Sequence, residues 1–95
     1  MAYEIKWSLT AQDDFDDILE FISESKTNET AIDFIQVFYK KLDLLASMPY
    51  IGIESQKFPT IRRILITKTY SLLYQIESDI ITLIRVIDNR SAFQF

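Results

Sequence analysis

Three short apolar runs, separated by polar turns, occupy the chain between residues 61 and 90. The runs are residues 61–66, 70–76 and 80–87. Each run has the length of a strand and is rich in β-branched and aromatic residues. Only three residues join each run to the next. The pattern predicts an antiparallel meander, and such a sheet requires another layer of structure to cover at least one of its faces.

Apolar residues at helical spacing between residues 11 and 22 predict the first helix. Ser8 or Thr10 is expected to cap this helix. Asp13 and Asp14 are expected in its first turn, where the helix dipole favours negative charge. Further acidic side chains cover the remaining surface, and we interpret them as a solvated helix face. A metal site is the alternative, but the cluster lacks histidine and acids that converge from elsewhere.

A wider apolar stripe between residues 31 and 45 predicts a second helix that is buried on more than one side. Thr27 or Asn28 is the expected cap. The helix should end before Pro49, because the residue that precedes a proline is steered away from helical backbone angles. The link between the two helices is short, so they are expected to form an antiparallel hairpin. Residues 49–60 are expected to form the only extended loop.

An alternating stretch at residues 3–7 predicts one more strand, with Tyr3, Ile5 and Trp7 pointing inward. Together these patterns indicate a single α+β domain over residues 1–95 with the order β-α-α-β-β-β. The helical hairpin is expected to pack on one face of a small sheet in which antiparallel pairs dominate.

Alternation along the predicted strands places apolar residues on both faces of this sheet. In the second strand, Leu73 lies on the face opposite Leu72 and Tyr74. The third strand is expected to be apolar on both sides, with Ile80, Ile84 and Val86 opposing Ile81, Leu83 and Ile87. Two helices cover only one face of such a sheet. An apolar face left in water is usually an interaction surface, so the sequence predicts a binding partner or self-association.

The composition excludes several kinds of chemistry. The chain contains no cysteine and no histidine, which excludes disulfides, thiol catalysis, soft-metal sites and imidazole acid–base chemistry. We therefore expect neither a metal nor a cofactor. The net charge of −4 disfavours broad electrostatic binding of nucleic acid. No apolar run approaches the roughly 18 residues that span a bilayer, and no signal peptide is evident, so a cytoplasmic location without a membrane partner is expected.

The order and spacing of particular residues form a pattern over nearly the whole chain. It comprises Trp7, an acidic helix with Ala11 and Asp14, a second helix that ends in Leu45 to Pro49, Gly52, Ile61-Arg62-Arg63, Tyr74, and Val86-Ile87-Asp88-Asn89-Arg90. This pattern resembles the RelE/ParE superfamily of bacterial type II toxin–antitoxin toxins, of the plasmid stabilisation type. The resemblance implies a cognate antitoxin, whose disordered segment folds across the toxin and covers its working surface.

The superfamily has two branches, and the resemblance implies a different mechanism for each. ParE-like members resemble inhibitors of DNA gyrase. RelE-like members resemble ribosome-dependent mRNA endoribonucleases, which need cations on the phosphate and groups that transfer protons. Arg63 matches the family arginine on the strand after the loop, or Arg62 if the register slips by one, and Arg90 lies near the late arginine. Glu54 and Lys57 are the candidate base and acid.

The C-terminus weighs against a ribonuclease. That branch ends in an aromatic residue with a hydroxyl or an imidazole, whereas this chain has Phe93 and Phe95. Phenylalanine can stack on a base but cannot transfer a proton. We therefore favour ParE-like action on gyrase. The alternatives are a RelE-like ribonuclease that acts on ribosome-bound mRNA, and a non-toxic module that has kept only its antitoxin-binding role.

A further set of residues is expected to contact the partner: Arg62, Leu73, Leu83, Arg85, Phe93 and Phe95. Some of the arginines can instead serve the fold. Arg85 or Arg90 would then pair with Asp79, Asp88 or a carboxylate of the first helix. We favour this structural role for Arg85.

Overall fold

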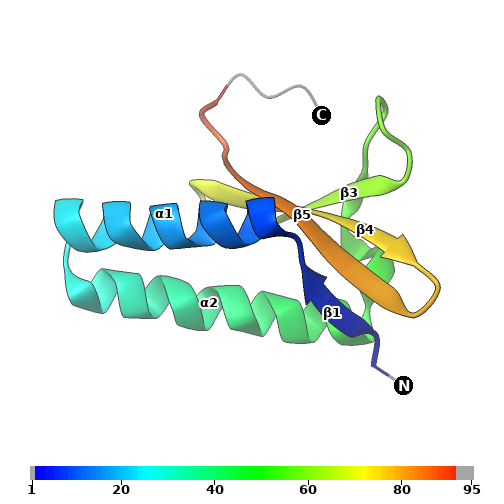
Figure 1. Ribbon diagram of the computed structural model, residues 1–95, viewed down its shortest axis with the longest axis horizontal. Coiled ribbons are helices and arrows are strands. Elements are labelled where there is room, and N and C mark those ends of the chain that lie inside the picture. Colours follow the sequence, from blue (N-terminus) through cyan, green and yellow to red (C-terminus); the bar gives the residue numbers. More distant parts are fainter. Residues whose placement is uncertain (1, 92–95) are drawn as a thin grey trace.

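A helical hairpin packs against a mixed five-stranded sheet in the computed structural model, which describes residues 2–91 (Figure 1). The hairpin consists of α1 (Leu9–Ser25) and α2 (Asn28–Ser47). The strands are β1 (Glu4–Trp7), β2 (Ile53–Glu54), β3 (Ile61–Leu65), β4 (Tyr70–Glu77) and β5 (Ile80–Asp88). They lie side by side in the order β1-β5-β4-β3-β2. The α+β class, the hairpin and the meander are therefore confirmed.

A hydroxyl side chain marks the start of each helix. Ser8 Oγ accepts a hydrogen bond from the backbone N–H of Ala11 at 3.0 Å. Thr27 Oγ1 accepts one from the N–H of Thr30, also at 3.0 Å. Each bond satisfies one of the N–H groups that the first turn of a helix leaves without a partner. Both caps are among the residues that the sequence predicted.

The cap at Ser8 places the acidic residues of α1 differently from the expectation. The first turn of this helix contains no acidic residue, so the prediction that Asp13 and Asp14 occupy that turn is wrong. A cap at Thr10 would have placed them there. Starting the helix two residues earlier moves both carboxylates into the second turn, where Asp14 faces β5 and forms the ion pair described below.

The segment between α2 and β3 is more regular than the sequence predicted. Residues 49–60 were expected to form an extended loop, but they contain the 3-10 helix η1 (Pro49–Ile51) and the strand β2. Strand β2 pairs antiparallel with β3, and Ile53 lies opposite Arg63. Its two residues are too few to produce an alternating pattern, so this strand could not be predicted from the sequence.

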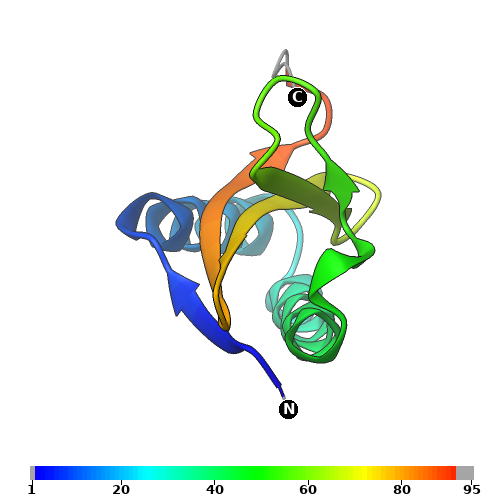
Figure 2. The ribbon, with the colours of Figure 1, turned by 90° about the vertical axis from the view of Figure 1, so that its right-hand side faces the viewer.

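Strand β1 completes the other side of the sheet. It pairs in parallel with β5, with Ile5 opposite Ile81 and Trp7 opposite Leu83. The remaining strand pairs are antiparallel. Figure 2 shows β1 and the β2–β3 unit at opposite sides of the sheet. The chain therefore enters at one edge of the sheet and forms the opposite edge with β2.

Aromatic rings fill the space between the hairpin and the sheet. Trp7 stacks on Phe38 of α2 with ring centroids 5.4 Å apart, and Phe15 of α1 lies 4.8 Å from the same ring. Phe38, Leu45, Leu72, Tyr74, Ile81 and Leu83 are fully enclosed. Burying one large apolar side chain contributes roughly 1.5–3 kcal/mol, so this layer supplies much of the stability.

A β-bulge in β5 changes which side chains face the helices. Leu73 pairs with Arg85, but the next residue, Tyr74, pairs with Leu83, so Ile84 is an extra residue in β5. The extra residue interrupts the alternation of side chains. Leu83 consequently lies in the core beneath the helices and has no exposed surface. The expectation that Leu83 belongs to the outer face and contacts a partner is wrong.

The outer face of the sheet is also less exposed than the sequence suggested. Leu73 and Ile87 lie outside the core cluster, yet only 2% and 8% of their surfaces are exposed. The centre of this face therefore offers little apolar surface to a partner.

Candidate interaction surfaces

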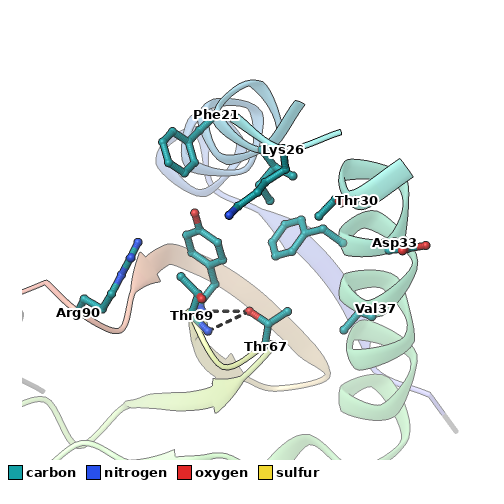
Figure 3. Close-up of a pocket in the computed structure, with 11 residues that line it drawn as sticks. Phe21, Lys26, Thr30, Asp33, Val37, Thr67, Thr69 and Arg90 are labelled. Atoms are coloured by element: carbon teal, nitrogen blue, oxygen red, sulfur yellow. Dashed lines mark hydrogen bonds between the residues drawn. The ribbon is translucent and has the colours of Figure 1, made fainter. Parts of the chain in front are cut away.

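A groove lies at the end of the molecule where the two helices meet. It begins as a cavity of about 460 Å³ between the helices and the start of β4, lined by Phe21, Phe34, Val37 and Tyr70 among others. A second hollow of about 480 Å³ shares Phe21, Tyr70 and Arg90 with the first and extends past α1 to the end of β5. We call the two together the hairpin-end groove. Figure 3 shows Lys26 and Arg90 on either side of its first cavity.

The floor of the groove is held by hydrogen bonds within the β3–β4 turn. Thr67 Oγ1 accepts from the N–H groups of Thr69 and Tyr70, each at 3.2 Å (Figure 3). Asn89 then joins this turn to the end of β5. Its Nδ2 donates to the carbonyl of Lys68 at 3.1 Å, and its Oδ1 accepts from the buried hydroxyl of Ser71 at 2.5 Å. The groove therefore has a firm polar base beneath apolar walls.

Arg90 is engaged by a carboxylate at the rim of the groove. Its Nη2 and Nε donate to the two oxygens of Asp88 at 2.7 and 3.0 Å. These hydrogen bonds lower the pKa of Asp88 from 3.8 to about 2 and raise the pKa of Arg90. Burial raises the pKa of the neighbouring Tyr70 hydroxyl, and the charge of Asp88 acts in the same direction. At neutral pH the rim therefore carries a closed ion pair beside a neutral phenol.

Asp14 closes the free edge of β5 beyond the point where β1 ends. Its carboxylate accepts from Arg85 Nε at 2.8 Å and from Arg85 Nη2 at 3.1 Å. It also accepts from the backbone N–H of Val86 at 3.0 Å. This bidentate bonding raises the pKa of Arg85. The expected pairing of Arg85 with a carboxylate of the first helix is confirmed.

The hydroxyl of Tyr74 joins the centre of the sheet to the segment before β2. It donates to the carbonyl of Pro49 at 2.8 Å and accepts from the N–H of Gly52 at 2.9 Å. Burial raises the pKa of this hydroxyl. A Cβ at position 52 would lie 2.3 Å from the same oxygen, so only glycine fits there. We call this arrangement the Tyr74 joint.

Arg62 reinforces the joint from the sheet edge. Its Nη1 donates to the carbonyls of Gly52 at 2.8 Å and Tyr50 at 3.2 Å, and its Nη2 lies 3.4 Å from Glu54. The sequence predicted a partner contact for Arg62 and a catalytic role for Glu54, and both stay predictions. The structure shows in addition that the two side chains help to hold β2 against β3. The sequence did not predict the Tyr74 joint, although Gly52 and Tyr74 belong to the residue pattern that resembles the toxin superfamily.

The family model for the ParE toxin of type II toxin–antitoxin systems, parDE, matches residues 5–93. The chain belongs to the ParE toxin family. It is thus a type II toxin of the ParE/RelE superfamily, and the resemblance seen in the sequence is confirmed. A comparison with curated proteins gave no match.

Solved structures of low sequence identity share the ParE fold. A chain of the chromosomal ParDE system from P. aeruginosa has a TM-score of 0.77 and 18% identity, over 92% of this chain and 96% of that one. A copper-bound mutant toxin from Helicobacter pylori has a TM-score of 0.68 and 18% identity, over 96% of this chain and 99% of that one. A chain of the RelBE2 toxin–antitoxin complex from Mycobacterium tuberculosis has a TM-score of 0.62 and 16% identity, over 94% of this chain and 100% of that one. At such identities the likeness establishes the fold alone.

Of the residues of the ribonuclease alternative, Glu54, Lys57 and Arg63 lie on β2, the β2–β3 loop and β3, whereas Arg90 lies apart from them. Arg63 is on β3 between Ile53 and Leu73, and Arg90 follows β5. The amine of Lys57 lies 5.8 Å from the centre of the Phe58 ring, in the β2–β3 loop. Phe93 and Phe95, predicted to contact a partner, lie outside the described residues.

Within residues 2–91, no helix is long and apolar enough to cross a membrane. In the same range, no group of three or more acidic side chains is arranged to hold a metal ion.

Proposed function

We propose that this ParE-family chain inhibits DNA gyrase by binding to it, and that a cognate antitoxin neutralises it. The family match supports the class of toxin. The ion pairs that hold its charged side chains support gyrase as the target. The toxin would act in the cytoplasm, and its gene pair would serve plasmid stabilisation.

One observation carries the choice of gyrase: Arg90 and Glu54, two of the side chains that mRNA cleavage would need, are held in separate ion pairs. Asp88 holds Arg90 at 2.7 Å, and Arg62 lies 3.4 Å from Glu54. Cleavage needs cations, a proton donor and a proton acceptor that converge on one phosphate. Two strands separate β5 from β2, which amounts to about 14 Å along the sheet at ~4.8 Å per strand. Inhibition by binding requires no such convergence.

The hairpin-end groove is the surface that best suits the antitoxin. The P. aeruginosa relative belongs to a ParDE system and the M. tuberculosis relative to a RelBE2 toxin–antitoxin complex, and we extend the partner to this chain. Phe21 is 55% exposed and Val37 is 37% exposed, although both are large apolar side chains. A disordered antitoxin segment that folds on binding can bury both, and the buried area offsets the cost of ordering it.

The target is tested with purified toxin in two parallel assays, gyrase supercoiling and cleavage of ribosome-bound mRNA. We expect inhibition of supercoiling, reversal of that inhibition by an equimolar amount of antitoxin, and intact mRNA. Cleaved mRNA with unaffected supercoiling would establish the RelE-like alternative. Harmless expression of the chain without its antitoxin would favour the non-toxic binding module.

The antitoxin site is tested with Phe21→Ser and Val37→Ser. Each should weaken antitoxin binding by about tenfold in a titration by calorimetry, because each removes an apolar contact from the interface. Ile32→Ser is the matched control, since Ile32 lies on α2, is 52% exposed and does not line the groove. Unchanged affinity in both groove variants would place the antitoxin elsewhere.

A further inference from the structure

Exposed apolar side chains gather along the outer edge of the sheet, on η1, β2, the β2–β3 loop and β3. We call this surface the β2 edge. It consists of Tyr50, Ile51, Ile53, Phe58 and Leu65, whose exposed fractions are 61%, 39%, 66%, 46% and 55%. Single exposed apolar residues are ordinary, but a cluster of this kind marks an interaction site.

The strand register makes part of this surface continuous. Ile53 lies opposite Arg63, and Leu65 is two residues further along β3. Side chains two apart on a strand point to the same face, so Ile53 and Leu65 are diagonal neighbours on the outer face. Figures 1 and 2 show the β2–β3 loop projecting from the sheet on the side away from α2. The β2 edge is thus remote from the turn between the two helices.

The exposure belongs to a part of the chain that is fixed in place. The Tyr74 hydroxyl holds the backbone at Pro49 and Gly52, and Arg62 holds the carbonyls of Tyr50 and Gly52. A buried tyrosine hydroxyl and an arginine thus fix a segment whose own apolar side chains face water. A backbone segment that is already fixed loses little freedom when a partner covers it, which favours binding.

Positive charge surrounds the β2 edge. The guanidinium of Arg62 lies 5.2 Å from the centre of the Tyr50 ring, and the Lys57 amine lies 5.8 Å from that of Phe58. Residues 48–66 contain three bases, Lys57, Arg62 and Arg63, against the single acid Glu54. Residues 1–30 show the opposite balance, with eight acids against two lysines. The complement of this edge is therefore an apolar patch bordered by carboxylates.

We propose that the toxin binds its protein target through the β2 edge. The matching surface of the target is an apolar patch with an acidic border. This inference rests on the proposed function, because it needs a protein target, and it leaves the hairpin-end groove to the antitoxin. A second copy of the chain fits less well, because two copies joined through this edge would bring their cationic borders together.

The test compares two isoleucines of similar exposure. Ile53→Ser changes the β2 edge, and Ile32→Ser changes an exposed position on α2 outside both surfaces. Each full-length variant is assayed for gyrase inhibition, for growth arrest on induced expression, for antitoxin affinity and for oligomeric state by light scattering. Circular dichroism confirms that the variants fold. Leu65→Ser repeats the test at a second position of the edge.

We expect Ile53→Ser and Leu65→Ser to raise the half-inhibitory concentration by at least about tenfold, while Ile32→Ser changes it by less than about twofold. Antitoxin affinity should remain within about twofold in all three variants. Full potency of Ile53→Ser and Leu65→Ser would overturn the inference. So would an equal loss of antitoxin affinity, which makes the edge an antitoxin site, or a wild-type dimer that the edge variants dissociate.

The two proposals fail in different ways. If the wild-type toxin arrests growth without inhibiting gyrase, the gyrase proposal is wrong, and the growth assay decides the inference. Growth arrest lost in Ile53→Ser and kept in Ile32→Ser would still support the β2 edge, and growth arrest kept in both would refute it. A wild-type chain that neither inhibits gyrase nor arrests growth would refute both proposals.

Discussion

The two sides of the sheet differ in how polar contacts cover them. On the β1 side, β1 pairs with β5 as far as Leu83. Beyond that point, at the part of β5 that we call the β5 edge, the Ser8 hydroxyl donates to the carbonyl of Ile84 at 3.0 Å. Asp14 then accepts from the N–H of Val86 at 3.0 Å. The start of α1 thus covers this edge with polar side chains. At the opposite edge, β2 pairs with only two residues of β3 and exposes Ile53.

The difference shows which parts of a small fold remain available to a partner. An open sheet edge is an aggregation hazard that proteins usually cover or shield with charge. This chain covers the part of β5 that β1 leaves unpaired, and it leaves the β2 edge apolar, with cations around it and a fixed backbone beneath it. We infer that the β5 edge serves stability and the β2 edge serves binding. The four predictions below test that division, from the largest expected effect to the smallest.

The largest effect should come from Gly52→Ala. The added Cβ would lie 2.3 Å from the Tyr74 hydroxyl oxygen, and overpacking of this kind costs about 1–3 kcal/mol of unfolding free energy. Tyr74→Phe should also destabilise the chain, because it leaves the N–H of Gly52 and the carbonyl of Pro49 without their partner. Urea denaturation measures both changes.

The double variant of these two residues separates their effects. Tyr74→Phe removes the nearest of the atoms that the new methyl group would meet, while two ring carbons at 2.8 and 2.9 Å remain. The double variant should therefore lose somewhat less stability than the sum of the single variants. Strictly additive losses would show that the hydroxyl oxygen adds nothing to the clash.

A somewhat smaller effect is expected on the covered edge. Asp14→Ala removes the acceptor for Arg85 and for the N–H of Val86, at a cost of about 1–2 kcal/mol. Arg85 is 47% exposed and can turn to water, which limits the loss. Asp14→Asn keeps an oxygen for Val86 and should recover part of the stability. If Asp14→Ala were as stable as wild type, α1 would not be needed to close β5.

The exposed edge should tolerate substitution without loss of stability. Ile53 is 66% exposed, so Ile53→Ser should change the unfolding free energy by no more than about 0.5 kcal/mol. Thermal unfolding followed by circular dichroism measures this change beside Ile32→Ser. A loss several times larger would mean that Ile53 supports the fold, which would contradict its assignment to binding.

The smallest effect concerns Asp88 at the end of β5. Its folded pKa is about 2, below the ordinary 3.8, so the stabilising contribution of its pair with Arg90 is complete above pH 3.8. It is lost as the pH falls toward 2. Arg90→Gln should raise the pKa of Asp88 toward its ordinary value, which an NMR titration of the carboxyl carbon measures. Solvent screens this exposed pair, so the stability change should be slight.

Much of the fold follows from local patterns. The caps Ser8 and Thr27, the apolar stripes of the helices and the short turns between the strands act within a few residues of the chain. These features predicted the hairpin and the meander. The function class followed from the order of residues such as Gly52 and Tyr74, although their physical role was not visible in that order.

The candidate surfaces were predicted less well, because they depend on contacts between distant segments. Leu83 was expected on the outer face, and the bulge at Ile84 turned it into the core. The contact of Arg62 with a partner stays a prediction, and the sequence did not show that Arg62 also holds the backbone at Gly52. The burial of Leu83 and the backbone contact of Arg62 cannot be predicted from the periodicity of a single strand, because each depends on a neighbouring strand or turn.

The sequence by itself determined the two helices, the three strands of the meander and the family, because each depends on local spacing or on the order of residues. Only the tertiary structure decided which charges are engaged and which apolar surface is open. Asp14 meets Arg85 across 71 positions of the chain, and the Tyr74 hydroxyl meets Gly52 across 22. Such pairs form only when distant segments of the chain come together. The first covers β5, and the second fixes the segment before β2 while the apolar side chains of the β2 edge stay exposed.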